Sequence, residues 1–311
     1  MRYFAYGSNL DPLDWREHCQ DRGFDPASVR EVCPALMPDM CLRFDYRSAK
    51  RGAGAANVAP LVGHVVCGAL FEVSDEGWVA LDVKEGVAGG KYARTLRTAI
   101  LPDGTLERVH TYEVAPDSRG AFCAPNTHYA NIVRAGLAAR GWPVEGLERA
   151  AADAPPQSLV EGLFVYGTLM RGESRFGFIG QSALRSAQAA TIAGTLHQTA
   201  GDYPAMRLPA QGAASARVHG EFMRFHDLPA YLPRLDAVEE FGGYDDPAPQ
   251  YWRTVVRVDL GDGDGGDGRD GGDGSGGGSG QRLAWGYVAG DPSLALDRID
   301  SGNWRAFMGT T

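Results

Sequence analysis

Two tandem domains of the α+β class are predicted from the sequence by three observations. The chain has 311 residues, about twice a common single-domain length. Three short segments of its first half recur in its second half in the same order. Within each half, strand-like and helix-like patterns do not alternate regularly, which favours α+β over a doubly wound sheet.

The internal repeat consists of three pairs of segments at a nearly constant offset. The offsets are 160, 154 and 159 residues, a period too long for a solenoid, so they indicate a duplicated domain. The pairs are Tyr3–Leu10 with Leu163–Met170, Leu81–Glu85 with Leu235–Glu239, and Tyr92–Leu96 with Tyr251–Val255.

The predicted domain boundary lies in a proline-containing stretch between the two sets of repeats. Pro155 and Pro156 follow a run of small residues there, a composition typical of a linker. The expected segments are a first domain at 1–150, a linker at 151–159 and a second domain at 160–311.

A second unusual stretch, residues 261–280, contains almost only glycine and aspartate, with serine and one arginine. It separates two strand-like runs whose counterparts in the first domain are joined by a short turn. We therefore expect a disordered loop at a hairpin tip. Its carboxylates match neither an EF-hand loop nor a glycine-rich calcium repeat, so no metal site is predicted there.

Composition and charge restrict the class of protein and its partners. Hydrophobic residues make up 44% and charged residues 22% of the chain, as in soluble globular proteins. A net charge of −9 argues against nucleic acid or a membrane surface as a partner. The five cysteines form no C-x-x-C pair, and neither a secretory signal nor a membrane helix is recognisable. We therefore expect a cytoplasmic protein.

Two ordered sets of short motifs carry a family resemblance. In the first half they are Tyr6-Gly7-Ser8-Asn9, Gly54-Ala55-Ala56-Asn57, Leu81-Asp82-x-x-Glu85-Gly86 and Tyr92. In the second half they are Tyr166-Gly167-Thr168-Leu169, Tyr203-Pro204-Ala205, Leu235-Asp236-x-x-Glu239, Tyr251-x-Arg253 and Ser301-Gly302-Asn303-Trp304. The first set resembles the γ-glutamylcyclotransferase branch, and the second the γ-glutamylamine cyclotransferase branch, of one superfamily.

The resemblance implies a fold and a type of site for each half. Each domain is expected to be a small mixed β-barrel with flanking helices and one catalytic glutamate. The loop after the first strand is expected to grip the α-carboxylate of a glutamyl group. Neither a metal nor an organic cofactor is implied, and the seven histidines show no ligand spacing.

The chemistry itself requires a base. The substrate's α-amine must attack its own γ-carbonyl, yet an amine with a pKa of about 8 is mostly protonated at neutral pH. Glu85 and Glu239 are the candidate catalytic residues, and we expect a partly apolar pocket to raise their pKa. In the second half the motif leaves two adjacent carboxylates, because Glu240 follows Glu239 where the first half has Gly86; the alignment with Glu85 selects Glu239.

The glycine loops are the candidate substrate-binding elements, because glycine permits close backbone approach and consecutive N–H groups can converge on an anion. The predicted binding residues are Tyr6, Gly7, Ser8, Asn9, Leu10 and Tyr92 in the first site, and Tyr166, Gly167, Thr168, Leu169 and Tyr251 in the second. For Tyr92 and Tyr251 a role at the rim stays open beside substrate contact. Asp82 and Asp236 are expected to cap or orient the glutamate segments. Arg94 and Arg253 could each pair with a carboxylate, but solvation is the more common state of an arginine at a strand edge.

The predicted function is release of 5-oxoproline and a free amine or amino acid from a small-molecule γ-glutamyl amide. One alternative is a module that binds γ-glutamyl or amino-acid ligands without turnover. A second alternative is a tailoring enzyme that acts on a γ-glutamylated biosynthetic intermediate. The leaving amine and the oligomeric state do not follow from the sequence.

Overall fold

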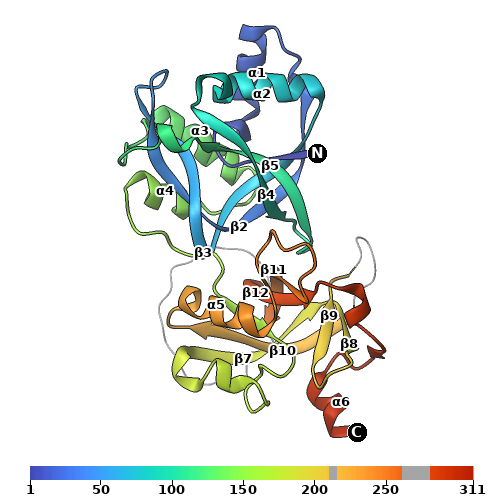
Figure 1. Cartoon of the computed structure of the whole chain (residues 1–311). Helices are drawn as coiled ribbons and strands as arrows, with labels where there is room; N and C mark the ends of the chain where they lie inside the picture. Colours follow the sequence, from blue (N-terminus) through green and yellow to red (C-terminus); the bar gives the residue numbers. More distant parts are fainter. Residues whose placement is uncertain (210–215, 261–280, 311) are drawn as a thin grey trace. The chain divides into compact units, whose positions relative to one another are not determined.

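The computed structural model describes residues 1–209, 216–260 and 281–310 (Figure 1). The chain divides into two compact units, a first unit at Met1–Leu159 and a second unit at Val160–Thr311. The loop expected at 261–280 lies outside the described residues. Among the helices that are described, none is both long enough and apolar enough to cross a membrane.

The first unit is a closed β-barrel with helices around it. Its strands are β1 (Arg2–Ala5), β2 (Val29–Ser48), β3 (Ala53–Val73), β4 (Tyr92–Ile100) and β5 (Leu106–Val114), paired in the order β1-β3-β2-β4-β5. The barrel closes where β1 pairs in parallel with β5, Tyr3 lying opposite His110. Figure 1 shows α1 (Pro12–Arg22) and α2 (Asp75–Glu85) together at one end, and α3 (Thr127–Ala138) and α4 (Glu145–Ala151) alongside.

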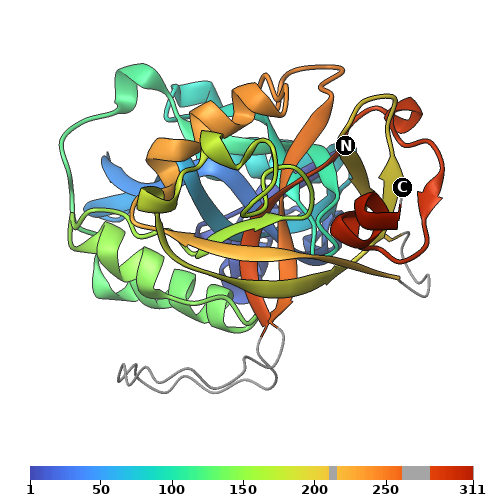
Figure 2. The ribbon, with the colours of Figure 1, turned by 90° about the horizontal axis from the view of Figure 1, so that it is seen from below.

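The second unit is also a closed barrel. Its strands are β6 (Gly162–Val165), β7 (Leu184–Ala193), β10 (Arg217–Phe225), β11 (Tyr251–Leu260) and β12 (Gln281–Ala289). Strands β7 and β10 run side by side in both views (Figures 1 and 2). A small sheet of β8 (Thr195–Gln198), β9 (Pro204–Arg207) and β13 (Arg298–Ile299) adjoins it, with helices α5 (Leu228–Val238) and α6 (Trp304–Thr310).

The two barrels have the same topology. Strand β6 pairs antiparallel with β10 and parallel with β12, as β1 pairs with β3 and β5. The order β6-β12-β11-β7-β10 therefore matches β1-β5-β4-β2-β3 around the closed ring. The predicted α+β class, with two small mixed barrels and flanking helices, is confirmed.

The first strand of each barrel is buried along most of its length. Phe4 and its counterpart Phe164 are 0% and 1% exposed, because one face of the strand fills the barrel and the other is covered. The loops that follow these strands are therefore anchored to buried strands of the two barrels. Because β1 and β6 hold the same place in the two strand orders, the two glycine loops follow equivalent strands.

Candidate active site

Helix α2 carries Glu85 to the site in the first unit. Ser74 caps the start of the helix by accepting a hydrogen bond from the Gly77 amide. Gly86 ends it in the left-handed conformation, at φ 68°, which glycine adopts without steric cost. Glu85 is consequently the last helical residue, and it is half-buried.

The glycine loop after β1 lies directly against Glu85. Asn9 Nδ2 donates hydrogen bonds of 2.7 Å to Glu85 Oε1 and 2.8 Å to the Tyr3 hydroxyl. Residues Ser8–Leu10 form one helical turn in which the Leu10 amide donates to the Gly7 carbonyl. The side chain of Leu10 is fully buried, so this residue shapes the turn.

The tyrosines predicted for the first site are buried and hydrogen-bonded to main-chain carbonyls. The Tyr6 hydroxyl donates to the Tyr112 carbonyl at 2.6 Å, and the Tyr92 hydroxyl donates to the Ala56 carbonyl at 2.7 Å. These bonds tie the loop and the strands around Glu85 into one frame. Substrate contact by either ring stays a prediction.

Helix α5 brings Glu239 to the corresponding place in the second unit. The helix ends at Val238, and the amide of Glu239 donates to the Leu235 carbonyl as the capping residue. Glu239 is half-buried and lines a pocket, whereas Glu240 is exposed. Glu240 has φ 51° and occupies the left-handed position that Gly86 takes in the first unit.

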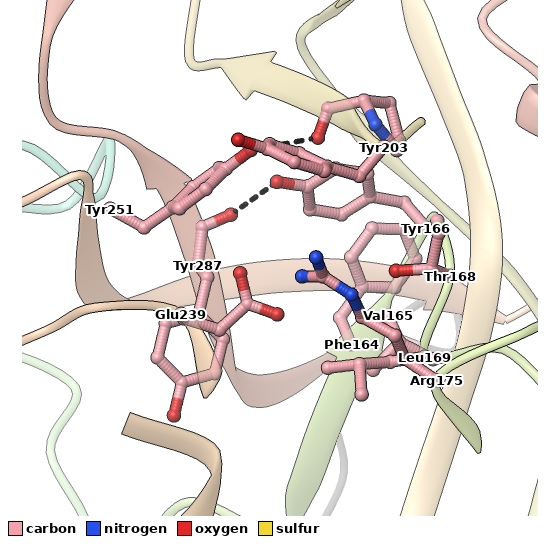
Figure 3. Close-up of a pocket in the computed structure, with 12 residues that line it drawn as sticks. Phe164, Val165, Tyr166, Thr168, Leu169, Arg175, Tyr203, Glu239, Tyr251 and Tyr287 are labelled. Atoms are coloured by element: carbon pink, nitrogen blue, oxygen red, sulfur yellow. Dashed lines mark hydrogen bonds between the residues drawn. The ribbon is translucent and has the colours of Figure 1, made fainter. Parts of the chain in front are cut away.

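The pocket of the second unit gathers all the residues predicted for this site. They are Tyr166, Gly167, Thr168, Leu169, Glu239 and Tyr251. The pocket is completed by residues that the sequence analysis did not assign to a site, namely Phe164, Val165, Arg175, Tyr203, Pro204 and Tyr287. Figure 3 shows the Glu239 carboxylate and the Arg175 guanidinium pointing toward each other.

The hydrogen bonds that frame this pocket repeat those of the first unit. The Tyr166 hydroxyl donates to the Tyr287 carbonyl at 2.8 Å, and the Tyr251 hydroxyl donates to the Pro204 carbonyl at 3.0 Å (Figure 3). The Tyr287 hydroxyl donates to Asp236 Oδ1 at 2.7 Å. The corresponding bond in the first unit, from Tyr112 to Asp82, is 2.6 Å long. The duplication therefore preserved the frame as well as the fold.

The aspartates three residues before each glutamate orient neighbouring side chains. Asp82 accepts a hydrogen bond from Arg94 Nε at 3.2 Å, and Asp236 Oδ1 lies 3.5 Å from Arg253 Nε. Of the two states expected for these arginines, pairing with a carboxylate is the one observed, and solvation is wrong for Arg253, whose side chain is 1% exposed. The tertiary fold buries this guanidinium against Asp236 and the aromatic rings around it.

Burial acts on both glutamates, but the opposing charges differ. Burial raises the pKa of Glu85, while the Lys84 charge and the Asn9 hydrogen bond act in the opposite direction. Burial raises the pKa of Glu239 to about 7 despite the positive charge of Arg175. In both units, burial thus favours the protonated form of the carboxyl relative to a free glutamate.

Four side chains near the sites were not assigned to a site by the sequence analysis, although Tyr203 was part of one motif of the resemblance. Arg51 and Tyr129 lie beside the first loop, and Arg175 and Tyr203 lie beside the second. Neither pair falls in a segment that the internal repeat covers, so the repeat gave no signal for them. Within the three described ranges, no group of three or more His, Cys, Asp and Glu side chains is placed to hold a metal ion.

Together, these features define a class: small closed mixed barrels in which a glycine loop faces a half-buried glutamate. The model of the family "Gamma-glutamyl cyclotransferase, AIG2-like" matches residues 163–306, which make up most of the second unit. No curated protein is similar enough to the chain to count as a match.

Several solved structures are similar to parts of the chain. One named gamma-glutamyl cyclotransferase is 26% identical, over 50% of this chain and 88% of its own, with a TM-score of 0.41. YkqA from Bacillus subtilis is 22% identical over 50% of this chain and 56% of its own, with a TM-score of 0.42. An AIG2-like protein from Mus musculus is 15% identical over 44% and 88%, with a TM-score of 0.28.

Proposed function

We propose that each unit is a cyclotransferase site that converts a γ-glutamyl amide into 5-oxoproline and a free amine. The observation that carries the proposal is a half-buried glutamate, Glu85 or Glu239, held against the glycine loop after the first barrel strand. The family match at residues 163–306 adds support for the second unit.

The reaction forms one bond and breaks another. The α-amine nitrogen of the substrate attacks its γ-carbon, and the bond from that carbon to the leaving nitrogen breaks. The glutamate accepts a proton from the attacking amine and returns it to the leaving nitrogen, so no other reagent is consumed. Attack within one molecule removes much of the barrier once the two groups are aligned.

The glutamate and the glycine loop each suit this reaction. A general base is most effective when its pKa lies near the working pH, and burial raises the pKa of Glu239 to about 7. In the loop, the amides of Ser8 and Asn9 open a helical turn, so they have no partner inside that turn. Such amides are donors for the anionic groups of a substrate and of the tetrahedral intermediate.

The test is release of 5-oxoproline by the full chain from a set of γ-glutamyl amides that includes glutathione and γ-glutamyl-lysine. Glu85→Gln and Glu239→Gln are made separately and together. Each single variant should lose activity at one site by about 100-fold or more, the usual worth of a positioned base. The matched control is Glu240→Gln, which removes an exposed carboxylate beside Glu239 and should retain activity.

The outcomes separate the proposal from its rivals. Activity that survives in the double variant would refute a glutamate base. Binding of γ-glutamyl ligands without any 5-oxoproline would favour a binding module. Loss in only one of the two single variants would assign all turnover to one unit.

A further inference from the structure

One barrel strand of the second unit carries a carboxylate that is almost fully buried. Glu221 lies on β10, and its side chain is 6% exposed. Its Oε2 accepts a hydrogen bond of 3.1 Å from the Arg171 amide and one of 3.3 Å from Arg171 Nε. Its Oε1 accepts from Arg305 Nη1 at 3.2 Å. The carboxylate therefore joins the chain after the glycine loop to helix α6, whereas other residues line the pocket of Glu239.

The segment that Glu221 contacts runs from Thr168 to Arg175. The Arg175 amide donates to the Thr168 carbonyl at 2.9 Å, so the segment folds back on itself with Arg171 at its bend. Arg305 Nη2 donates to the Arg171 carbonyl, so both main-chain groups of Arg171 have partners outside the segment. Both ends of the segment line the pocket of the second site. A shift of the bend would therefore move pocket residues.

The first unit has a small side chain at this position of its barrel. Ala69 of β3 lies opposite Ala5 of β1. Glu221 of β10 lies opposite Val165 of β6, which is the same register in the second barrel. Ala69 is 0% exposed, and the barrel that contains it closes with the same topology. The barrel fold therefore does not require a carboxylate at this position.

A helix covers the glycine loop of the first unit instead. Helix α3 passes so close to the loop that a Cβ on Gly136 would lie 2.5 Å from Leu10 Cβ. Arg140, which follows α3, donates from Nη1 to the Leu10 carbonyl at 2.9 Å. Its carboxylate partner Glu31 is 41% exposed. Arg140 and Arg305 thus each come after the last barrel strand of their unit, and each donates to the main chain at the end of a glycine loop.

Stability alone does not explain the buried carboxylate of Glu221. Removing an ion pair from water costs roughly as much as the pairing returns, so such a pair is weak evidence for stability. A carboxylate with charged donors does set their directions, because charge-assisted hydrogen bonds are short and strong. One of its donors is the main-chain amide of Arg171, so this directing effect reaches the loop segment itself.

We propose that Glu221 is a positioning residue of the second active site. It acts through Arg171 and Arg305, and it holds the segment 168–175 in place beside Glu239. This inference rests on the proposed function. Removal of the carboxylate leaves the barrel folded, as Ala69 does in the first unit, but loosens the segment.

A loosened segment changes the charges around the base. The charged groups that act on Glu239 are Arg175, from the segment, and Asp236, from helix α5. The Arg175 charge lowers the pKa of Glu239, and Figure 3 shows the two side chains pointing toward each other. Withdrawal of Arg175 should therefore raise this pKa and move the rising limb of kcat/KM of the second site to higher pH.

The test measures each site alone in the full chain, by release of 5-oxoproline from γ-glutamyl-lysine. The second site is measured in Glu85→Gln and the first in Glu239→Gln. Glu221→Ala, which copies the first unit, and Glu221→Gln, which keeps an acceptor for the amide, are added to each. Glu161→Gln is the matched control, because Glu161 is a glutamate of the same unit that also pairs with two arginines.

Loss of the carboxylate should act on one site only. We expect Glu221→Ala to lower kcat/KM of the second site by about 100-fold, mostly through kcat, the usual result of a displacement near 1 Å. Glu221→Gln should recover part of the loss, and the first site should not change. A loss that follows the unfolded fraction in thermal denaturation, with an unmoved pH limb, would overturn the proposal and assign Glu221 a structural role.

Hydrogen exchange separates this inference from the proposed function. In Glu221→Ala the amides of residues 168–175 should exchange faster by about tenfold or more, because the segment loses hydrogen bonds to a charged group. Strand β11 should exchange as in the parent. That result supports the positioning contacts even if no substrate is turned over. Unchanged exchange of the segment, equal acceleration across the whole second unit, or faster exchange with unchanged kcat/KM would each refute the proposal.

Discussion

Asn9 Nδ2 lies 2.7 Å from Glu85 Oε1 in the first unit, whereas Leu169 occupies the position of Asn9 in the pocket of Glu239. A donor to a carboxylate favours its ionised form, and an apolar neighbour does not. A second difference between the units acts on the pKa in the same way. Lys84, whose charge lowers the pKa of Glu85, precedes that residue, whereas the uncharged Val238 precedes Glu239. These two differences in sequence place Glu85 and Glu239, which hold equivalent positions in the two units, in different electrostatic environments.

The first prediction exchanges the loop residues. Leu169→Asn, measured in Glu85→Gln, should lower the pKa of Glu239 and move the rising limb of kcat/KM to lower pH, because the ionised base persists there. Asn9→Leu, measured in Glu239→Gln, should move the limb of the first site to higher pH. Leu169→Met keeps the position apolar and is the control. Profiles that superimpose on those of the parents would contradict the assignment.

The second prediction concerns stability. Burial raises the folded-state pKa of Glu239 to about 7, so the folded state binds this proton more tightly than the unfolded state. The stabilisation is complete below the unfolded pKa of about 4.5 and is lost as pH rises through 7. Glu239→Gln, which stays neutral, should therefore be more stable than the parent at pH 8 by about 2 kcal/mol.

Chemical denaturation at pH 5 and pH 8 measures this difference. At pH 5 the carboxyl is protonated in the folded state but mostly ionised in the unfolded state, so the gain should fall to about a quarter of its value at pH 8. Glu240→Gln serves as the control, since its side chain is exposed. A gain at pH 5 as large as that at pH 8 would show that burial of the charge is not its cause.

The third prediction uses the two loop glycines. A Cβ on Gly167 would lie 2.6 Å from Pro204 Cγ, and the proline ring cannot rotate away. A Cβ on Gly7 would lie 3.3 Å from the Tyr129 hydroxyl, a milder contact. Gly167→Ala should reduce kcat/KM of the second site by about 100-fold, the usual result of a displacement near 1 Å. Gly7→Ala should cost the first site less than about tenfold.

A double variant checks the cause of that loss. Pro204→Ala removes the clashing ring atoms but keeps the carbonyl that accepts from Tyr251. Gly167→Ala/Pro204→Ala should therefore recover most of the activity in the 5-oxoproline assay. If the double variant is as inactive as Gly167→Ala, the clash is not the reason.

The fourth prediction compares the two strand arginines. The Arg253 side chain is 1% exposed beside Asp236, whereas that of Arg94 is 29% exposed beside Asp82. Arg253→Met should destabilise the second unit by about 3 to 5 kcal/mol, because it leaves the Asp236 carboxylate without its charged partner. Arg94→Met should cost the first unit about 1 kcal/mol or less. Urea denaturation measures both, and equal losses would contradict the difference in burial.

The motifs of each half were enough to predict the duplication, the α+β class and the pairing of a glycine loop with a glutamate. These features are local: Gly7 and Gly167 each follow a buried strand, and Glu85 and Glu239 each stand at the end of a short helix. Both motifs recur in the second half at a nearly constant offset, so the sequence carries the same evidence for a site twice.

Only the tertiary structure revealed the arginine–tyrosine pairs and the burial of Arg253. Arg51 meets Tyr129 across 78 positions of the chain, and Arg175 meets Tyr203 across 28, at sites that share no sequence pattern. Such contacts depend on how closed strands bring distant side chains together. Local sequence determines which face a residue occupies, but the folded barrel determines which partner it meets there.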